Sequence, residues 1–499
     1  MLFRLFAFAL LVVTPVLGCA HDGVSPSFAG ETTHTIISSS NFPSRIAQED
    51  ANGFYFQPSG LAEDYPEEST TQERIRADIK LLSDAHARYL RVGIGWDGIE
   101  QTPGRYSWGY WDDLIRIAVQ NGITILPYVC YSPKWSNDDP KDYWRKPPKD
   151  PGRFASFMYE IARRYAGKVQ SWELWNEPDI ENYWLGTPEE FAVMVRDGAL
   201  AVRRADPSAR IVLGGMAQGR TPFLEKLLRD FKLGPFFDAV NVHGYLETWE
   251  QLPAESYPDR LHRIQGLMIE TAPKADLWMA EFGYSDYRMN DREVSPWVEA
   301  VYDYEHTPQY QGVSLWKHHV LATASQALSL STWYRIHDLP PDEEVIGDAN
   351  NRHLGIVDVK GKKKPAFAAL KLFNQLFDQP TRPLLSNIEM TKPARSESVL
   401  KVFENVDGSF LVTGWLRSSL PSEVPNKSGR ARDKRRETLA VKLPLAPSHD
   451  WELVIHNLPP EQSGPKTRLA RLAQLEGTWL KDISLRGDRV FIAELRPRK

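Results

Sequence analysis

The sequence predicts an α/β fold, a (β/α)8 TIM barrel followed by a C-terminal antiparallel β-sandwich domain. Two observations support this prediction. Between residues 51 and 378, short apolar runs alternate with amphipathic segments, as parallel strands alternate with helices in a barrel. Between residues 379 and 499, short β-rich segments are separated by turn residues instead. A chain of 499 residues is long enough for both parts.

The N-terminus predicts a secretory signal peptide over residues 1–20. Arg4 supplies a positive charge, and the apolar run that follows is too short to span a bilayer as a helix. Residues 16–19 also resemble a bacterial lipoprotein box, in which Cys19 would become the lipidated first residue. A secreted, a periplasmic and a membrane-anchored protein therefore all remain open. Residues 21–50 are rich in Ser, Thr and Gly and predict a tether or an irregular segment that leads into the barrel.

The composition is that of a soluble globular protein, with 42% hydrophobic and 25% charged residues. A formal net charge of −5 gives no reason to expect a nucleic acid partner. The chain contains 16 Trp and 19 Tyr residues, a high count that suits a polysaccharide or an oligosaccharide as the partner. The oligomeric state stays open.

The barrel strands are predicted from apolar runs that helical segments separate. The first strand is ambiguous between residues 53–56 and 34–37. The remaining strands are predicted at residues 90–94, 123–128, 169–175, 210–213, 237–243, 276–281 and 312–316. Capping boxes at Thr70-x-x-Glu73 and Thr187-x-x-Glu190 mark two helix starts. The competing solution is an open doubly wound sheet, but no glycine-rich phosphate turn follows an early strand.

The C-terminal part reads as a sandwich of short strands. These are predicted at residues 398–403, 410–415, 438–443, 451–455, 468–473, 477–483 and 490–495. This domain could bind carbohydrate or could brace the barrel.

Two glutamates are the strongest candidates for catalysis. Glu177 and Glu281 each end a strand-like run, the fourth and the seventh of the predicted barrel. Active sites of this fold lie at the carboxyl ends of the strands. A pair of carboxyl groups can act as a general acid and a nucleophile, which is what cleavage of a glycosidic bond requires.

Several motifs resemble one family of enzymes. Trp-Asn-Glu-Pro at residues 175–178, Glu-Phe-Gly at 281–283, Arg-Val-Gly at 91–93 and Asn-Val-His-Gly-Tyr at 241–245 resemble clan A of the glycoside hydrolases. Within this clan the chain looks most like family 39, which contains β-xylosidases, α-iduronidases and bacterial exopolysaccharide hydrolases. The resemblance covers the whole predicted barrel. It implies a retaining double displacement, with Glu177 as the acid/base and Glu281 as the nucleophile.

The resemblance also implies roles for residues around the pair. Arg91 would keep Glu281 ionised, and Tyr245 would donate a hydrogen bond to it. Asn176 would bind the sugar 2-hydroxyl, and His243 would contact the sugar or the acid/base.

Three tryptophans are further candidates for sugar binding. Trp316, expected at the end of the eighth strand, would form the aromatic floor under the cleaved sugar. Trp96 and Trp135 would line neighbouring subsites.

Other nearby residues are predicted to have no catalytic role. Glu173 lies four residues before Glu177, so it points into a deeper layer of the barrel and is interpreted as structural. The run Lys317-His318-His319 lacks the ligand spacing of a zinc site, so no metal and no cofactor is expected. Cys130 is expected to be a small buried filler.

Alternative functions remain open. A catalytically inactive glycan-binding protein of a surface polysaccharide system would explain the lipoprotein box, although both glutamates are retained. A transglycosylase would use the same covalent intermediate and pass the sugar to another sugar. An unrelated barrel enzyme would need a strand-end Lys or a cluster of metal ligands, and neither is apparent.

Overall fold

The computed structural model describes residues 53–384, 389–391, 397–446, 449–458 and 473–498, which belong to one compact unit. The predicted signal peptide at 1–20, with Cys19, and the predicted tether at 21–50 lie outside the described residues. Among the helices that the structure describes, none is both long enough and apolar enough to cross a membrane.

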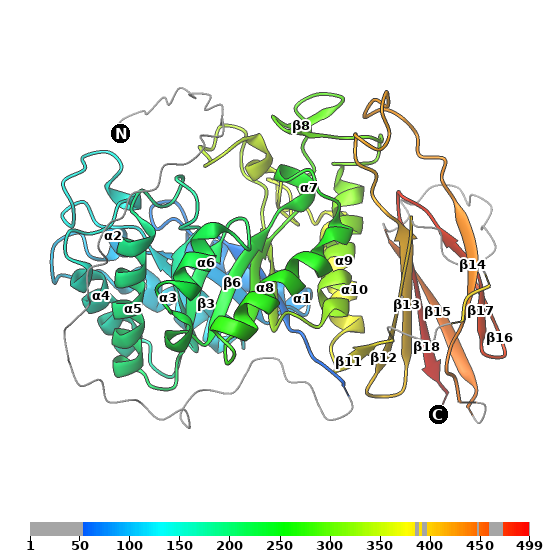
Figure 1. The fold of residues 1–499 in the computed structure, drawn as a ribbon, viewed down its shortest axis with the longest axis horizontal. Coiled ribbons are helices and arrows are strands. Elements are labelled where there is room, and N and C mark those ends of the chain that lie inside the picture. The colour runs from blue at the N-terminus through cyan, green and yellow to red at the C-terminus, as the bar shows by residue number, and fades with distance from the viewer. Residues whose placement is uncertain (1–52, 385–388, 392–396, 447–448, 459–472, 499) are drawn as a thin grey trace, which may run out of the picture. The chain divides into compact units, whose positions relative to one another are not determined.

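Parallel strands form the centre of the molecule and confirm the predicted barrel (Figure 1). Within the described residues, eight strands close into one ring in which each strand pairs in parallel with both neighbours. In chain order they are β1 (Ser59–Glu63), β2 (Tyr89–Gly95), β3 (Thr124–Cys130), β4 (Ser171–Asn176), β5 (Arg210–Met216), β6 (Ala239–Gly244), β7 (Asp276–Phe282) and β10 (Leu330–Tyr334). The predicted strands 2 to 7 are all present. Cys130 ends β3 and is buried, as predicted.

Helices surround this ring and bury their apolar faces against it. They are α1 (Gln72–Asp84), α2 (Trp96–Ile99), α3 (Gly109–Gln120), α4 (Pro151–Arg164), α5 (Pro188–Ala205), α6 (Pro222–Arg229), α7 (Leu246–Trp249), α8 (Tyr257–Thr271), α9 (Pro308–Ser325) and α10 (Pro365–Leu376). The capping box at Thr187 and Glu190 is formed as predicted. The other prediction was one residue early, because Thr71 and not Thr70 caps α1.

The predicted eighth strand is wrong. Residues 312–316 lie inside α9, and the true eighth strand is β10. An apolar run of this length does not distinguish a strand from a helix that is buried on every side, and nearly all of α9 is buried. The helix start carries a recognisable signal, because Thr307 caps the Tyr310 backbone N–H and Pro308 occupies the first turn.

The first strand also differs from both predicted positions. Tyr55 forms only an isolated bridge with Thr381, and residues 34–37 lie outside the described residues. The true first strand, β1, is short and has little β-branched character. Its Gly60 lies so close to β2 that an added Cβ would be 2.3 Å from the Tyr89 carbonyl oxygen, so this position favours glycine for close strand approach.

Antiparallel sheets follow the barrel, as predicted. Among the described residues, one sheet has the order β11 (Thr381–Pro383), β12 (Ser398–Asn405), β13 (Phe410–Leu416), β18 (Val490–Pro497) and β15 (Trp451–Leu458). The other has the order β14 (Glu437–Lys442), β17 (Trp479–Leu485) and β16 (Gln474–Glu476). Both sheets contribute to one apolar core, for example through Val412 and Leu480. The predicted strand at 468–473 lies almost wholly outside the described residues.

Trp316 belongs to the contact between α9 and the sheets, and its predicted place under the substrate is wrong. Its indole N–H donates a hydrogen bond to Thr413 Oγ1 on β13 at 2.9 Å, and its side chain is fully buried. Trp415, also on β13, donates to Glu255 Oε1 at 2.6 Å. The sheets are therefore joined to the barrel by buried, directional contacts, which is consistent with a bracing role.

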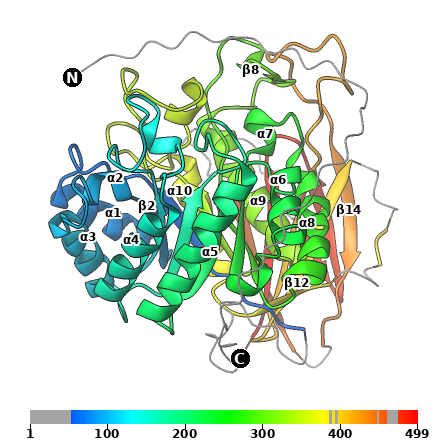
Figure 2. The same cartoon turned by 60° about the vertical axis from the view of Figure 1, so that its left-hand side comes forward.

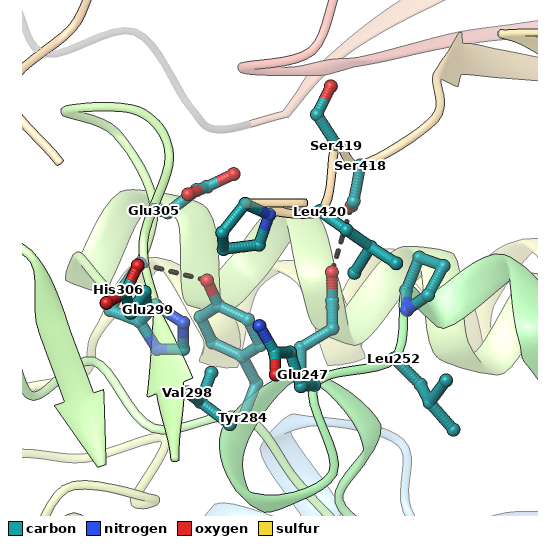
Figure 3. A pocket seen from close by; sticks show the side chains of 13 residues that line it. Glu247, Leu252, Tyr284, Val298, Glu299, Glu305, His306, Ser418, Ser419 and Leu420 are labelled. Atoms are coloured by element: carbon teal, nitrogen blue, oxygen red, sulfur yellow. Dashed lines mark hydrogen bonds between the residues drawn. The ribbon is translucent and has the colours of Figure 1, made fainter. Parts of the chain in front are cut away.

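A second contact ties the sheets to the segment after β6 (Figure 3). Ser418 donates to Glu247 Oε1 at 2.9 Å, and the Lys317 ammonium lies 3.1 Å from the Ser418 hydroxyl. Beside this contact is a small hollow, whose lining includes Tyr284 and Glu305. Burial raises the pKa of Glu305 to about 7. The predicted catalytic glutamates do not line this hollow.

Candidate active site

Glu177 directly follows β4 in an unusual backbone conformation. Its φ is 45°, and the φ of Trp175 is 79°, so two non-glycine residues near the strand end adopt left-handed conformations. Such conformations cost free energy and cluster at functional sites. The Glu177 backbone N–H donates to the Gly215 carbonyl of β5 at 2.8 Å, which holds the turn in place. Its side chain is 11% exposed and has His243 Nδ1 2.7 Å from Oε1.

Glu281 is the second-last residue of β7, and two donors hold its carboxylate. Arg91 Nη1 donates to Oε2 at 2.7 Å, and the Tyr245 hydroxyl donates to Oε1 at 2.7 Å. The side chain is 13% exposed. Its carboxylate therefore contacts a permanent cation, whereas the Glu177 carboxyl group contacts an imidazole.

The two carboxyl groups face one another. An oxygen of Glu177, an oxygen of Glu281 and a ring nitrogen of His243 all lie within 4.8 Å of one another. His243 Nδ1 is also 3.8 Å from Glu281 Oε2. The structure thus brings together the two glutamates and the histidine that the sequence singled out.

Burial and neighbouring charges shift the pKa values of Glu177, His243 and Tyr245. Burial raises the pKa of Glu177 above its ordinary value, although the hydrogen bond and charge of His243 act against it. Burial acts to lower the pKa of His243, but the neighbouring Glu281 and Glu177 outweigh it, so this pKa is raised. Burial and the adjacent Glu281 together raise the pKa of Tyr245. These shifts act toward the protonated form of Glu177 and keep the proton with which the Tyr245 hydroxyl donates.

Arg91 connects the Glu281 carboxylate to a deeper layer of the barrel. Its Nε and Nη2 donate to the two carboxylate oxygens of Glu173 at 2.9 Å, and Nη2 also donates to Asn176 Oδ1 at 2.9 Å. The guanidinium lies 4.2 Å from the centre of the Tyr128 ring. Arg91 is fully buried, so its orientation is set before any substrate binds.

Glu173 occupies the structural position that the sequence predicted. It is buried, and the Gly215 backbone N–H and Asn241 Nδ2 donate to it at 2.8 and 2.9 Å. Although burial opposes the charged form, the neighbouring Arg91 holds the pKa of Glu173 below its ordinary value. Glu173 therefore fixes Arg91 from a buried position.

The absence of a side chain at Gly215 leaves room for the His243 ring. A Cβ at Gly215 would lie 2.1 Å from His243 Nε2, so a larger residue would displace the ring. His243 Nε2 is buried and has no hydrogen-bond partner among the described residues. The ring therefore makes its directional contact through Nδ1 to Glu177.

Two predicted sugar-binding tryptophans lie in a packed aromatic cluster. Trp96 is 0% exposed, donates its N–H to Glu100 Oε2 and packs against Phe154 and Trp135. The prediction that Trp96 contacts a sugar is wrong for this structure, because its ring has no accessible face. Trp135 is half-buried and donates to the Glu100 carbonyl at 2.6 Å, so it retains some surface.

A carboxylate at the mouth of the barrel was missed from the sequence. Asp64 follows β1, its side chain is 38% exposed, and it accepts hydrogen bonds from Tyr128 at 3.0 Å and Tyr334 at 2.7 Å. Tyr334 ends β10. Correct placement of the first and eighth strands would have put both residues at the carboxyl ends of strands, where functional groups of this fold lie.

Among the described residues, two groups of side chains have the proximity of metal ligands. The first is the carboxyl pair with His243, where Arg91 already supplies a positive charge. The second combines Asp286, Asp338 and His353. There the Lys364 ammonium lies 2.8 Å from Asp286 and 3.1 Å from Asp338, so a side-chain cation already occupies the position that a metal would need.

Fold and site define the chain as a (β/α)8 barrel with paired carboxyl groups at the carboxyl ends of its fourth and seventh strands. No protein-family model matches the chain. It is similar to a β-xylosidase from Geobacillus stearothermophilus, 23% identical over 329 residues, which are 60% of this chain and 61% of that protein. A β-xylosidase from Caldicellulosiruptor saccharolyticus is 32% identical over 170 residues, covering 32% of this chain and 34% of that protein.

The chain thus spans less than two thirds of the length of these relatives. Among solved structures, it is similar to a family 39 glycoside hydrolase from the gut symbiont Bacteroides cellulosilyticus WH2, with a TM-score of 0.61 and 16% identity. That match covers 89% of this chain and 81% of the other. The resemblance to family 39 predicted from the sequence is confirmed.

Proposed function

We propose that the protein is a retaining glycoside hydrolase that cleaves O-glycosidic bonds of a polysaccharide or an oligosaccharide outside the cytoplasm. The observation that carries the proposal is the asymmetry of the carboxyl pair. Glu177 is buried beside an imidazole and has a raised pKa, whereas Glu281 contacts Arg91 and Tyr245. One group is suited to donate a proton and the other to attack as an anion.

In the first step, a Glu281 oxygen attacks the anomeric carbon while Glu177 protonates the departing glycosidic oxygen. A covalent glycosyl–enzyme ester forms, and the leaving alcohol departs with the proton of Glu177. Retaining enzymes place their carboxyl groups about 5–5.5 Å apart. Here an oxygen of Glu177 lies within 4.8 Å of an oxygen of Glu281, and this short separation supports direct attack. Inverting enzymes need about 6.5–9.5 Å to admit a water molecule between the carboxyl group and the sugar.

In the second step, ionised Glu177 removes a proton from water, and the oxygen of that water attacks the anomeric carbon. The ester bond to Glu281 breaks, and Glu281 returns as a carboxylate. If a sugar hydroxyl takes the place of water, the same intermediate gives transglycosylation.

Two neighbours are proposed to bind the sugar. Arg91 engages Asn176 Oδ1, which orients the amide so that its Nδ2 is the group available to the sugar 2-hydroxyl. Contacts to this hydroxyl strengthen in the transition state. Trp135 is proposed to line a neighbouring subsite with its remaining accessible surface.

The test is an assay of the purified protein and its Glu281→Ala variant on aryl β-glycosides and β-linked polysaccharides. β-Xylosides come first, because the similar proteins named above are β-xylosidases. We expect new reducing ends from the wild type alone, and proton NMR at early times should show a product with the substrate's anomeric configuration. An inverted product contradicts the double displacement. Saturable glycan binding without cleavage supports the inactive binding protein instead.

The proposed location has its own test. The N-terminal signal supports export, with or without a lipid on Cys19. Mass spectrometry of the full-length protein expressed in a bacterium should find either a diacylated Cys19 at the mature N-terminus or an unmodified N-terminus near residue 21. The first result supports anchoring and the second supports secretion. A cytoplasmic protein that keeps residues 1–20 contradicts both.

A further inference from the structure

We propose that Trp297 is a platform for a sugar ring of the substrate other than the ring that Glu281 attacks. This inference rests on the proposed function and deepens it, because it makes the substrate a chain of several sugars. Trp297 lies at the tip of the hairpin formed by β8 (Glu293–Ser295) and β9 (Val298–Glu299), in the segment between β7 and α9. Figures 1 and 2 show this hairpin close to α7, the helix that follows β6.

The indole of Trp297 is exposed but held in one orientation. It is 54% exposed, and its N–H donates to the carbonyl oxygen of Trp249, the last residue of α7. The hairpin beneath it is anchored, because Val294 and Val298 are buried and Asn350 Nδ2 donates to the Val294 carbonyl at 2.7 Å. A fixed, exposed aromatic ring loses little conformational entropy when a ligand stacks on it.

A short series of contacts connects this indole to the nucleophile. The ring of Trp249 lies 4.6 Å from the ring of Tyr245, edge to face. Tyr245 in turn donates its hydrogen bond to Glu281. Trp297 is therefore separated from the carboxyl pair by two aromatic side chains, a position suited to a ring further along the same sugar chain.

The distribution of exposed apolar side chains supports this position. Among the described residues, eight large hydrophobic side chains are exposed, and five of them lie in loop segments that follow β6, β7 or β10. These three strands are adjacent in the barrel. The five, named here the apolar rim, are Leu252, Met289, Trp297, Ile346 and Val359.

A sugar ring is the occupant that best fits this surface. The C–H groups of a pyranose form an apolar face that packs against the electron-rich face of an aromatic ring, while its hydroxyl groups stay in water. The other members of the apolar rim are aliphatic, so Trp297 is the one that offers an aromatic face.

The experiment compares wild type, Trp297→Ala and Trp297→Phe on xylohexaose and on 4-nitrophenyl β-D-xyloside. For Trp297→Ala we expect kcat/KM on xylohexaose to fall about tenfold, mainly through KM, and to change less than twofold on the aryl xyloside. Trp297→Phe should keep most of the activity on xylohexaose. Ile269→Ala removes another exposed apolar side chain, on α8, and should match the wild type on both. Equal losses on the two substrates, or no loss on xylohexaose, would overturn the platform.

Binding measurements separate this inference from the proposed function. Calorimetry of the Glu177→Gln variant with xylohexaose and cellohexaose, with and without Trp297→Ala, reports binding even if no glycan is cleaved. Weaker binding of a hexasaccharide when Trp297→Ala is added to Glu177→Gln supports the platform. Unchanged binding overturns it, and so does a Glu177→Gln protein that binds neither hexasaccharide. Sedimentation with phosphatidylethanolamine–phosphatidylglycerol vesicles that is lost in Trp297→Ala would overturn it in favour of a membrane-facing surface.

Discussion

The ends of β4 and β7 carry the same functional group in different surroundings. After β4, Glu177 contacts a titratable imidazole in a buried position, whereas in β7, Glu281 contacts a guanidinium and a phenol. The Arg91 guanidinium keeps its charge at any relevant pH, but the charge of His243 depends on pH. In the proposed mechanism, the neighbours of each carboxyl group assign the roles of acid and nucleophile, and substitutions on either side can test this assignment.

Loss of the nucleophile should have the largest effect. Glu281→Ala removes the proposed nucleophile, so we expect kcat to fall by about 10⁴- to 10⁶-fold on every substrate. Added azide should restore part of the turnover and give a glycosyl azide of inverted configuration, because azide enters the space of the missing carboxylate. Glu225→Ala, at an exposed ion pair on α6, is the matched control. If Glu281→Ala kept the activity of the wild type, another residue would have to be the nucleophile.

Loss of the acid/base should depend on the leaving group. For Glu177→Ala we expect a fall of about 10²- to 10⁴-fold in kcat/KM on unactivated glycosides. With a 2,4-dinitrophenyl glycoside, kcat/KM should fall much less, because that leaving group departs without a proton. Stopped-flow release of dinitrophenol measures this first step directly. Equal losses on both classes of substrate would mean that Glu177 does not act as the acid.

The sequence predicted the strand that ends at Glu177 and the strand that ends at Glu281 equally well. Strands 2 to 7 follow from uninterrupted apolar runs, and both glutamates stand at the ends of such runs. The hydrophobic pattern of these strands lies within each local segment. Periodicity and motif positions were therefore enough to place Glu177 and Glu281 at the same end of the barrel.

The strands that close the barrel were harder to predict, because β1 and β10 contain small and polar residues while α9 is buried on nearly every side and contains a short, largely apolar run. The wrong eighth strand placed Trp316 under the substrate and concealed Tyr334. Trp96 shows a related limit, since an aromatic residue in a motif can serve the core instead of the ligand. Only tertiary packing decides which face of such a ring remains accessible.

Removal of the Tyr245 hydroxyl should reduce activity less than removal of Glu281 itself. Tyr245→Phe keeps the ring against Trp249 and deletes the hydrogen bond to Glu281 Oε1. A hydrogen bond to a charged group contributes about 1.5–3 kcal/mol, so we expect kcat/KM to fall by about 10- to 150-fold, with the same fall on activated and unactivated substrates. Tyr287→Phe, outside the pair, serves as the control. A loss confined to unactivated substrates would connect Tyr245 with the acid instead.

The smallest expected effect is a shift in the pH profile from the Glu177 side. In the proposed mechanism Glu177 must be protonated for the first step, so the alkaline limb of kcat/KM follows its pKa. His243 acts to lower that pKa against the effect of burial. His243→Gln retains an N–H donor for Glu177 Oε1 but cannot carry a positive charge, so the pKa should rise further. The alkaline limb should then move to higher pH, with only a few-fold change at the optimum.

Profiles of wild type and His243→Gln on an aryl glycoside, between pH 4 and 9, measure the shift. In the double variant that combines His243→Gln with Glu177→Ala, the slow remaining activity should show no shift of an alkaline limb, because the acid that titrates in the wild type has been removed. A limb that stays in place would mean that His243 is neutral beside Glu177 and serves only to position it. A limb that moves to lower pH would mean that a neutral His243 accepts a hydrogen bond from protonated Glu177 and raises its pKa, and the asymmetry between the two strand ends would then rest on His243 and not on the burial of Glu177.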